Sequence, residues 1–429
     1  MKHPIKALAA VALVGVLVVS GCSRGEITAA SGEGASSGPV PTDSCPADAM
    51  KALAEGEPIK LGVSLAQSGP IAVVNNIAKA INAVFEKQNA EGGIDGHKIE
   101  FVVKDDAFET ARAVTNVRQL IDSTKVMAMV GQVGTPGVAA TQPFVERSCT
   151  PQLWVASGVS SLIADPEKHP FTTSNLAPYE TEAALWVKAL QDQGLTSANI
   201  AMINADDDRS EVFSDAVTES IEGTDLKLVS VEQVAAAAPS VDAQVNATLA
   251  KKPDAVLVGT STSNCPPLMT GLRRAGFTGT IIVNVTCAAI NTNFVPAGDA
   301  AKDVQVLTTT ADPANPMLAD DPELAEHHEV MKQYAPDADA NNGYTAGGYQ
   351  IGLLTVEALK NAAKLDGGLT RVNIMNAAWT VDAEIPLSPK GVRATLNWTE
   401  DPIWREDAQL MKYDPAKGLL PVGDVISID

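Results

Sequence analysis

The sequence predicts an α/β protein made of two doubly wound lobes. Short apolar strands alternate with amphipathic helices from residue 59 onward, and this alternation is typical of parallel βαβ units. A second series of the same kind starts after Pro178. The chain has 429 residues, of which 45% are hydrophobic, so it is too long for one comfortable core and two domains are expected.

The first series begins with a buried strand over residues 59–65, IKLGVSL. The loop AQSGP leads from this strand into a helix expected over 71–89, where apolar residues recur at every third or fourth position. Gly92 and Gly93 end that helix. The rest of the series is expected in the order strand 98–105, helix 110–122, strand 126–132 and strand 152–157.

The second series alternates helices with strands in the same way. Its helices are expected over 179–193, 211–221, 241–249 and 267–275, and its strands over 199–205, 226–232, 254–260 and 280–286. The later segments 304–310, 344–363 and 417–424 are then shared between the two Rossmann-like lobes. Each lobe is expected to have a crevice at the carboxyl ends of its strands.

The N-terminus reads as an export signal over residues 1–21. A basic start is followed by an apolar run that, as a helix, reaches only about 22 Å, short of the roughly 30 Å core of a bilayer. The run ends on VSGC, which resembles the bacterial lipobox, in which Cys22 becomes the new N-terminus and carries lipid on its sulfur. The alternative is an ordinary signal peptide in which Cys22 is incidental.

Residues 22–56 are expected to form a tether and an N-terminal clip. The part over 23–41, SRGEITAASGEGASSGPVP, is poor in apolar bulk and rich in Gly, Ser and Pro, so it behaves as a flexible leash. A chain lipidated at Cys22 is expected to lie on the outer face of the cell membrane, on the periplasmic or cell-surface side.

The four remaining cysteines form an even set in an exported chain, so two disulfides with three possible pairings are expected. We pair Cys265 with Cys287, because they flank one helix and one strand, which leaves Cys45 to clip the N-terminal segment onto Cys149. Free buried thiols are the alternative. No Cys/His spacing indicates a metal site.

Charge and motifs exclude several classes of function. The formal net charge of −21 argues against a nucleic-acid partner, because phosphate binding needs basic patches. No Gly-x-Ser-x-Gly elbow, P-loop or Gly-x-Gly-x-x-Gly fingerprint is present, so neither an enzyme nor a bound cofactor is expected. His327, His328 and Glu329 are expected on an exposed helix, where adjacent histidines point apart and do not share a metal.

Several segments resemble one known family. The run 92–121, GGIDGHKIEFVVKDDAFETARAVTNVRQLI, has SGP before it and MVGQVGTPG after it. Together with LRRAGFTGTIIV and TAGGYQIGLLTVEALKNA, it is similar to the branched-chain amino-acid binding proteins, the type I periplasmic solute-binding proteins of ABC importers. The resemblance covers roughly residues 58–426.

The resemblance implies a chain that crosses three times between two hinged lobes, which close on a small solute. Residues 57–176 with 307–383 are expected to form the first lobe, and 177–306 with 384–429 the second. It further implies a monomer that delivers its solute to the permease subunits of an ABC transporter. The alternative is a sensing protein that presents its solute to a membrane receptor, since one fold serves both uses.

In the family, loops after the strands of the first lobe read one end of the ligand. Carried over, the ligand contacts of this lobe are Gln67, Ser68, Gly134, Thr135, Gly158 and Ser160. Glycine lets backbone N–H groups approach closely and hydroxyls add donors at helix N-termini, so this chemistry fits a carboxylate. Loops rich in Gly and Ser are also simply turns.

The second lobe departs from the amino-acid pattern. Arg209 stands where the family commonly has tyrosine, and the GTSTSN loop with Ser261 and Thr262 replaces a further aromatic residue. Asn284 and Thr286 stand where an acidic residue would pair with an α-ammonium group. A buried ammonium group without a partner costs several kcal/mol. The residues of the second lobe therefore favour an α-amino acid as the solute less than the family resemblance does.

Arg209 favours an anionic group on the solute, because a guanidinium binds carboxylate through two hydrogen bonds. The alternative is a surface ion pair with one of the preceding acids, Asp206, Asp207 or Asp208. Tyr179, Tyr344 and Tyr349 are candidates for the cleft or for the core. We expect a small carboxylate-bearing solute, either a branched-chain amino acid or a related organic acid or amide.

Overall fold

The computed structural model describes residues 38–236, 238–389, 393–398, 402–403 and 407–427. The chain divides into the units Met1–Ala35 and Ser36–Asp429, and the following account concerns the second unit. The expected signal peptide, Cys22 and the first part of the tether lie outside the described residues. None of the helices in the described part is both long enough and apolar enough to span a membrane.

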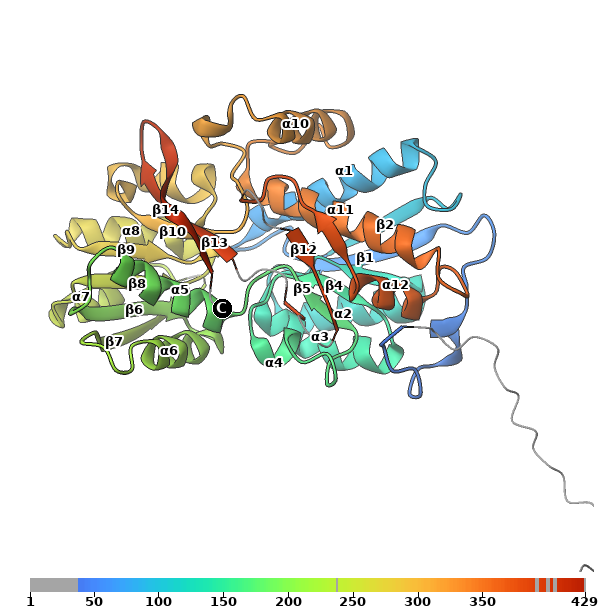
Figure 1. Cartoon of the computed structure of the whole chain (residues 1–429), viewed down its shortest axis with the longest axis horizontal. Coiled ribbons are helices and arrows are strands. Elements are labelled where there is room, and N and C mark those ends of the chain that lie inside the picture. The colour runs from blue at the N-terminus through green and yellow to red at the C-terminus, as the bar shows by residue number, and fades with distance from the viewer. Residues whose placement is uncertain (1–37, 237, 390–392, 399–401, 404–406, 428–429) are drawn as a thin grey trace, which may run out of the picture. The chain divides into compact units, whose positions relative to one another are not determined.

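The first sheet has five parallel strands in the order β2-β1-β3-β4-β5 (Figure 1). These strands are β1 Ile59–Leu65, β2 Ile99–Asp105, β3 Ala128–Val130, β4 Gln152–Val155 and β5 Thr172–Ser174. The helices between them are α1 Asn75–Ala90, α2 Thr110–Gln119, α3 Thr135–Ser148 and α4 Ser160–Ile163. Every residue of β1 except Lys60 is buried, as expected for a strand of a parallel sheet covered on both faces.

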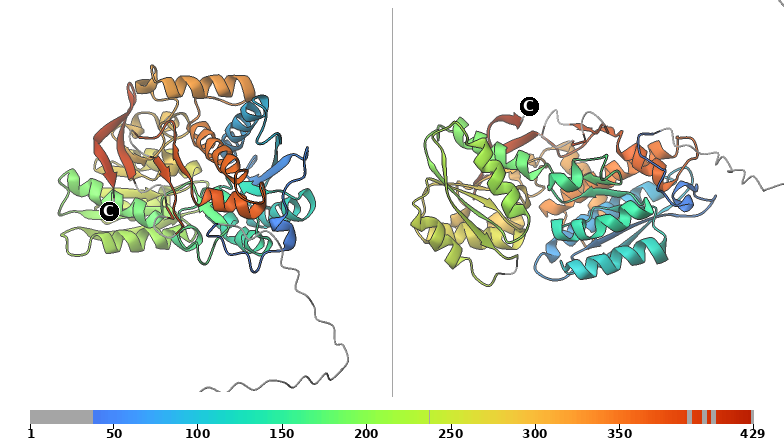
Figure 2. Two further views of the ribbon diagram at one scale, coloured as in Figure 1. Left: turned by 45° about the vertical axis from the view of Figure 1, so that its right-hand side comes forward. Right: turned by 90° about the horizontal axis from the view of Figure 1, so that it is seen from below.

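The second sheet has seven strands in the order β14-β13-β10-β9-β8-β6-β7. The parallel part is β6 Asn199–Ala205, β7 Lys227–Val234, β8 Ala255–Gly259, β9 Thr280–Val283 and β10 Gln305–Thr308. The antiparallel hairpin β13 Asp407–Asp414 and β14 Gly418–Ser427 extends it beyond β10. Its helices are α5 Tyr179–Asp192, α6 Arg209–Ser220, α7 Asp242–Ala250, α8 Cys265–Arg274 and the short α9 Val295–Ala297. Figure 2 shows helices on both faces of this sheet.

The chain returns to the first sheet after β10. Helices α10 Pro322–Tyr334, α11 Gly343–Ala362 and α12 Arg371–Ala378 pack with α1 around the first core, and a small antiparallel pair, β11 Asp382–Glu384 and β12 Arg393–Thr395, follows them. The second sheet has a separate core on each of its faces. Doubly wound lobes built on parallel sheets are therefore the observed architecture, as the sequence predicts.

The described cores give a guide to where the chain changes lobe. Leu307 packs in a core of the second sheet, whereas Ala394 and Leu396 pack in the core of the first sheet and Ala408 again in that of the second. We therefore propose that the second and third crossings lie after Thr308 and between Leu396 and Ala408. The bounds expected from the sequence, 306/307 and 383/384, stay predictions, and this proposal places both crossings further along the chain.

Both disulfides join the cysteines that the sequence analysis pairs. Cys45 is bonded to Cys149 and Cys265 to Cys287. The N-terminal clip is held further by an ion pair between Asp48 and the largely buried Arg371, with 2.6 Å between Oδ2 and Nη2. This clip therefore fastens the start of the described chain to the first lobe.

Candidate functional site

A cavity of about 160 Å³ is lined by residues from both lobes. Its lining follows the carboxyl ends of strands, with Val133 and Thr135 after β3, Ala156 after β4, Ser261 after β8 and Thr286 after β9. Parallel strands point the same way, so the loops that follow them meet at one edge of each sheet. The two such edges face this cavity, which is the crevice expected from the sequence.

Most of the cavity wall is apolar. Its body on the side of the first lobe is formed by Ile71 and Val74, just before α1, by Ile77 in the first turn of α1, and by Phe108, in the loop after β2. Phe108 needs Gly134 as its neighbour, because a Cβ on Gly134 would lie 2.5 Å from the Phe108 ring, and Gly134 has φ +105°. A cavity with an apolar body and few polar groups is the usual form of a small-molecule site.

One end of the cavity carries the guanidinium of Arg209, at the start of α6. Arg209 is only 6% exposed. Its Nε donates to Asp207 Oδ1 at 2.8 Å and its Nη2 to Asp207 Oδ2 at 2.6 Å, and Nη2 also donates to Ser261 Oγ at 3.0 Å. Asp207 thus neutralises and orients the guanidinium. Arg209 lines the cavity and also pairs with a preceding acid, as the alternative expects, but the pair is buried rather than on the surface.

Beside Arg209, hydroxyl groups of the two lobes meet. Thr135 Oγ1, on α3, lies 3.0 Å from Ser157 Oγ and 3.4 Å from the hydroxyl of Tyr179, at the start of α5. Burial raises the pKa of Tyr179, so its hydroxyl stays protonated at neutral pH. This end of the cavity is therefore polar, with one buried cation and a small group of hydroxyls.

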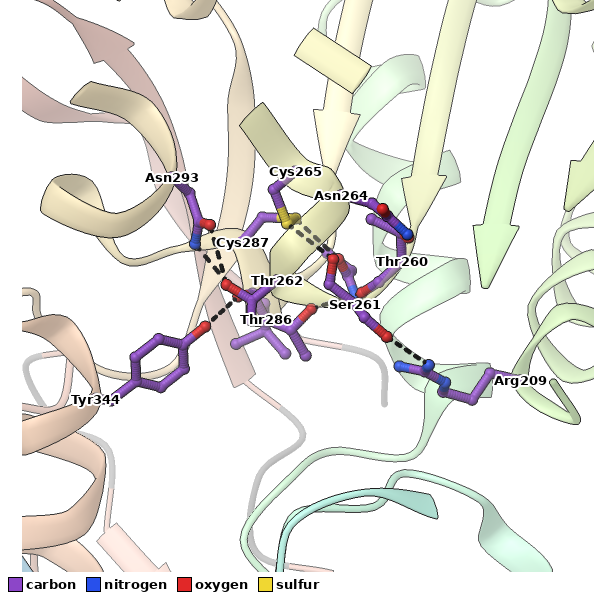
Figure 3. Close-up of a disulfide and its surroundings, with 12 residues drawn as sticks. Arg209, Thr260, Ser261, Thr262, Asn264, Cys265, Thr286, Cys287, Asn293 and Tyr344 are labelled. Carbon is purple, nitrogen blue, oxygen red and sulfur yellow. Dashed lines mark hydrogen bonds between the residues drawn. A yellow bond between two sulfur atoms is a disulfide. The ribbon is translucent and has the colours of Figure 1, made fainter. Parts of the chain in front are cut away.

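At another place in the wall, three hydroxyls donate to acceptors of the protein itself (Figure 3). Tyr344 Oη, on α11, donates to the carbonyl oxygen of Thr286 at 2.9 Å. Thr262 Oγ1 donates to Asn293 Oδ1 at 3.0 Å and Thr286 Oγ1 to the carbonyl oxygen of Thr260 at 2.8 Å. Burial raises the pKa of Tyr344 to about 12.

Asp312 lines the cavity near Tyr344, in the segment that leaves β10. Its Oδ2 accepts the N–H of Ile290 at 2.9 Å and its Oδ1 accepts the N–H of Ala314 at 2.7 Å. Burial raises its pKa to about 6, so it is mainly ionised at neutral pH. In the described part of the chain no ion pair involves Asp312.

The disulfide Cys265–Cys287 lies directly behind two loops of this wall. Cys265 follows the 3-10 turn Thr262–Asn264, and Cys287 ends the 3-10 turn Val285–Cys287. The bond holds these two turns together, as Figure 3 shows. It therefore fixes the positions of Ser261 and Thr262 relative to Thr286.

Of the ligand contacts predicted from the sequence, six line the cavity: Gly134, Thr135, Arg209, Ser261, Thr262 and Thr286. The other five lie outside its lining: Gln67, Ser68, Gly158, Ser160 and Asn284. Ligand contact stays a prediction for all eleven.

These five have other partners or neighbours in the structure. The backbone N–H groups of Gln67 and Ser68 donate to the carboxylate of Asp105, at 2.8 and 3.2 Å, where the family analogy expects a solute. Ser160 Oγ donates to Glu180 and Asn284 Nδ2 to a backbone oxygen. Gly158 lies under the Tyr179 ring.

Sequence reasoning missed Phe108 and Asp312 and left Tyr179, Tyr344 and Tyr349 undecided. Tyr179 and Tyr344 line the cavity, whereas Tyr349 is a core residue at 2% exposure. Phe108 was missed because it lies in a loop, where its φ is positive and no helical or strand pattern of apolar residues includes it.

The expectation of an exposed helix at His327 is wrong in one respect. Its side chain is fully buried against Tyr349, although α10 itself is a surface helix with exposed neighbours. Among the described residues, no group of three or more His, Cys, Asp or Glu side chains is placed to hold a metal ion.

Two α/β lobes around one largely apolar cavity define a class of solute-binding proteins. A family model described as periplasmic binding protein matches residues 58–404, and the chain belongs to this family. It is therefore a binding protein rather than an enzyme, and the family implies a periplasmic or extracellular location. Comparison with the curated proteins gives no match.

Solved structures share the fold at low sequence identity. A fatty acid ABC transporter substrate-binding protein from Thermomonospora curvata is 20% identical, with a TM-score of 0.77, and the match covers 88% of this chain and 94% of that one. A branched chain amino acid ABC transporter from Thermus thermophilus with bound valine is 15% identical, with a TM-score of 0.77 and coverage of 88% and 98%. A possible leucine/isoleucine/valine-binding protein from Rhodopirellula baltica SH 1 is 22% identical, with a TM-score of 0.71 and coverage of 89% and 98%.

Proposed function

We propose that this chain is a membrane-anchored, extracellular substrate-binding protein that captures a small carboxylate-bearing solute and delivers it to an ABC importer. The solute is a branched-chain amino acid or a related organic acid or amide. The observation that carries this proposal is the buried guanidinium of Arg209 at the end of an otherwise mostly apolar cavity. A guanidinium held in one orientation binds a carboxylate, while the apolar wall takes up a hydrocarbon body.

The structural neighbours support this class of solute. Two of them are described as a fatty acid transporter protein and as a structure with bound valine, and both compounds join a carboxylate to an apolar body. Support for an α-ammonium group is weaker, since Asn284 stands where the family analogy places an acid and donates its amide to a backbone oxygen at 3.1 Å. Organic acids without an α-amino group are therefore at least as well supported as amino acids.

The solute class can be tested by calorimetry on the purified mature chain with amino acids, aliphatic and aromatic acids, amides and neutral sugars. We expect carboxylates with an apolar body to bind. The double variant Asp207→Asn/Arg209→Gln, which removes both charges together, should weaken their binding at least tenfold, about 1.4 kcal/mol. Asp206→Asn, an exposed acid beside the pair, is the control. Binding of neutral sugars alone would contradict the proposal.

Anchoring depends on Cys22. We expect Cys22→Ala to release the protein into the medium or periplasm, because the acyl chains that hold it at the membrane are then missing. Membrane fractionation with a lipid label on the wild type measures this. Ser23→Ala is the control, because it leaves the lipidated sulfur unchanged. Membrane association of the Cys22→Ala variant, together with an unlabelled wild type, would refute the anchor.

The alternative is a protein that presents its solute to a membrane receptor. Neighbouring permease and ATPase genes would favour delivery to a transporter. Capture of a sensor kinase by the solute-loaded protein, with no permease retained, would favour the receptor instead.

A further inference from the structure

The hydrogen-bonding capacity of the cavity wall differs between its two polar ends. A hydroxyl has one proton to donate and two lone pairs to accept with. Tyr344, Thr262 and Thr286 each donate that proton to a carbonyl or amide oxygen of the protein. These three side chains can therefore only accept hydrogen bonds from a solute and cannot donate any.

Asp312 adds to the same end of the wall. An ionised carboxylate has about four acceptor positions, and backbone N–H groups occupy two of those on Asp312. Its carboxylate lies against Gly343, which directly precedes Tyr344 at the start of α11, and both Asp312 and Tyr344 line the cavity. We call this set, Thr262, Thr286, Asp312 and Tyr344, the acceptor end.

The opposite end offers donors. A guanidinium has five N–H groups, and those on Nε and Nη2 of Arg209 are directed at Asp207 and Ser261. Even with the neighbouring Tyr179 hydroxyl as a further acceptor, Nη1 keeps a proton for a solute. The hydroxyl of Ser261 accepts from Arg209, which leaves its own proton as a second donor. We call Arg209 the donor end, and Ser261 lies between it and the acceptor end.

The strand order fixes how far apart the two ends lie. Thr286 follows β9 and Arg209 follows β6, and β8 lies between these two strands. Two strand spacings amount to roughly 10 Å. Figure 3 shows Arg209 and Tyr344 on opposite sides of Ser261 and Thr286. The carboxylate and ammonium groups of an α-amino acid share one carbon, so they do not reach both ends.

We propose that the solute is an elongated carboxylic acid whose far end carries a hydrogen-bond donor, such as an ω-amino, ω-hydroxy or ω-amide group. Its carboxylate binds the donor end, its hydrocarbon chain lies along the apolar wall, and its terminal donor binds the acceptor end. A plain hydrocarbon tail would strip water from the acceptors without replacing its hydrogen bonds. This inference rests on the proposed function and narrows its class of solute.

The test is calorimetry with matched acids of four to eight carbons. At each length the alkanoate is compared with its ω-amino, ω-hydroxy and 2-amino derivatives, for example hexanoate with 6-aminohexanoate, 6-hydroxyhexanoate and 2-aminohexanoate. At the best length, we expect the ω-derivatives to bind at least tenfold more tightly than the alkanoate and the 2-amino acid. Equal or tighter binding of the alkanoate or the 2-amino acid at every length would overturn the inference.

Variants locate the effect. Tyr344→Phe should remove most of the tenfold gain, which is measured as the ratio of the affinities for the ω-derivative and the alkanoate of the same variant. Tyr349→Phe, the loss of a tyrosine hydroxyl in the core, should leave this ratio unchanged. Asp312→Asn should reduce the preference for ω-amino over ω-hydroxy acids. An unchanged gain in Tyr344→Phe would also overturn the inference. If no acid binds at any length, the proposed function itself fails, which differs from binding without a gain.

Discussion

Arg209 illustrates how one residue acquires its role from two short-range contacts. Asp207 accepts from both the backbone N–H and the side chain of Arg209, so the turn before α6 sets the side-chain direction. A buried charge requires such a partner, because its desolvation costs several kcal/mol when it is unpaired. The local sequence contains both members of the pair, but the choice between surface and cleft depends on Ser261, far away in the chain.

Glu182 is a second buried ionisable group, but it has no ion-pair partner among the described residues. It lies on α5 at 6% exposure and accepts the N–H of Val285 at 2.7 Å. Burial raises its pKa to about 8, so the folded protein holds it neutral at pH 7. Val285 lines the main cavity, so Glu182 supports the cavity from behind.

The pKa of Glu182 leads to a prediction on stability. The pKa of Glu182 in the folded protein lies above the ordinary value of 4.5. The contribution of protonated Glu182 to the free energy of unfolding is therefore complete below about pH 4.5 and is lost as the pH rises through about 8. Glu182→Gln keeps the acceptor for Val285 and cannot ionise. From pH 6.5 to pH 9 the wild type should lose about 1–2 kcal/mol of its free energy of unfolding, at about 1.4 kcal/mol per pKa unit, whereas the variant should not lose this amount.

Urea denaturation of both proteins at the two pH values measures this difference. Glu180→Gln, two residues before Glu182 on α5 and more exposed, is the control and should follow the wild type. Parallel pH profiles for Glu182→Gln and the wild type would show that Glu182 ionises as readily in the folded state as in the unfolded state.

At the scale of elements, the two disulfides stabilise different parts of the molecule. Cys265–Cys287 ties two turns that line the cavity, whereas Cys45–Cys149 ties the N-terminal clip to the end of α3, outside the cavity lining. Cys45–Cys149 closes a much longer stretch of chain than Cys265–Cys287, with a sequence separation of 104 against 22. Chain entropy therefore gives it the larger effect on the unfolded state.

Removing the two disulfides one at a time should show which of them affects solute affinity and which affects only stability. We expect Cys265→Ala/Cys287→Ala to lower stability by about 3 kcal/mol and solute affinity at least tenfold, because the cavity turns become freer. Cys45→Ala/Cys149→Ala should cost about 5 kcal/mol of stability and change the affinity less than twofold. Thermal unfolding and calorimetry at a temperature where both variants are folded give the two quantities. Equal losses of affinity would show that the inner disulfide has no special role at the site.

The elements that the sequence predicts well are those with a strong period. The strand at Ile59–Leu65 and the one at Asn199–Ala205 agree with the structure at both ends. Helix α3 was missed because Pro136 and Pro143 fall within it, although the first occupies a position where a helix tolerates proline. Strand β13 was missed because its polar residues alternate with apolar ones at only moderate contrast.

At the scale of the whole molecule, hydrogen bonds join the lobes around the cavity. Tyr344 Oη, in the first lobe, donates to the Thr286 carbonyl oxygen in the second, and Asn342 Nδ2 donates to Thr292 Oγ1 at 3.2 Å. A solute that contacts both lobes favours the closed arrangement only by its differential affinity for that arrangement. A shift from mostly open to mostly closed needs about 5.5 kcal/mol.

Closure can be followed in solution. We expect the radius of gyration of the mature protein, measured by X-ray scattering, to fall when a binding acid is added at saturation, because the lobes come together. A non-binding acid of the same length is the control. An unchanged radius with a bound solute would show that the lobes form a rigid block, and the trapping mechanism would then be wrong.

The sequence by itself determined the alternation of strands and helices and the expected cysteine pairs, because these depend on local periodicity and on spacing along the chain. Its motifs also carry the resemblance to the family that the family model then shows. Only the tertiary structure decided which polar groups face the cavity. Gln67 and Ser68 turn to Asp105, whereas Tyr344 and Asp312 reach the wall. A hydrogen bond depends on atoms that approach within about 3 Å in space, and residues far apart in the chain come that close only when the lobes have folded.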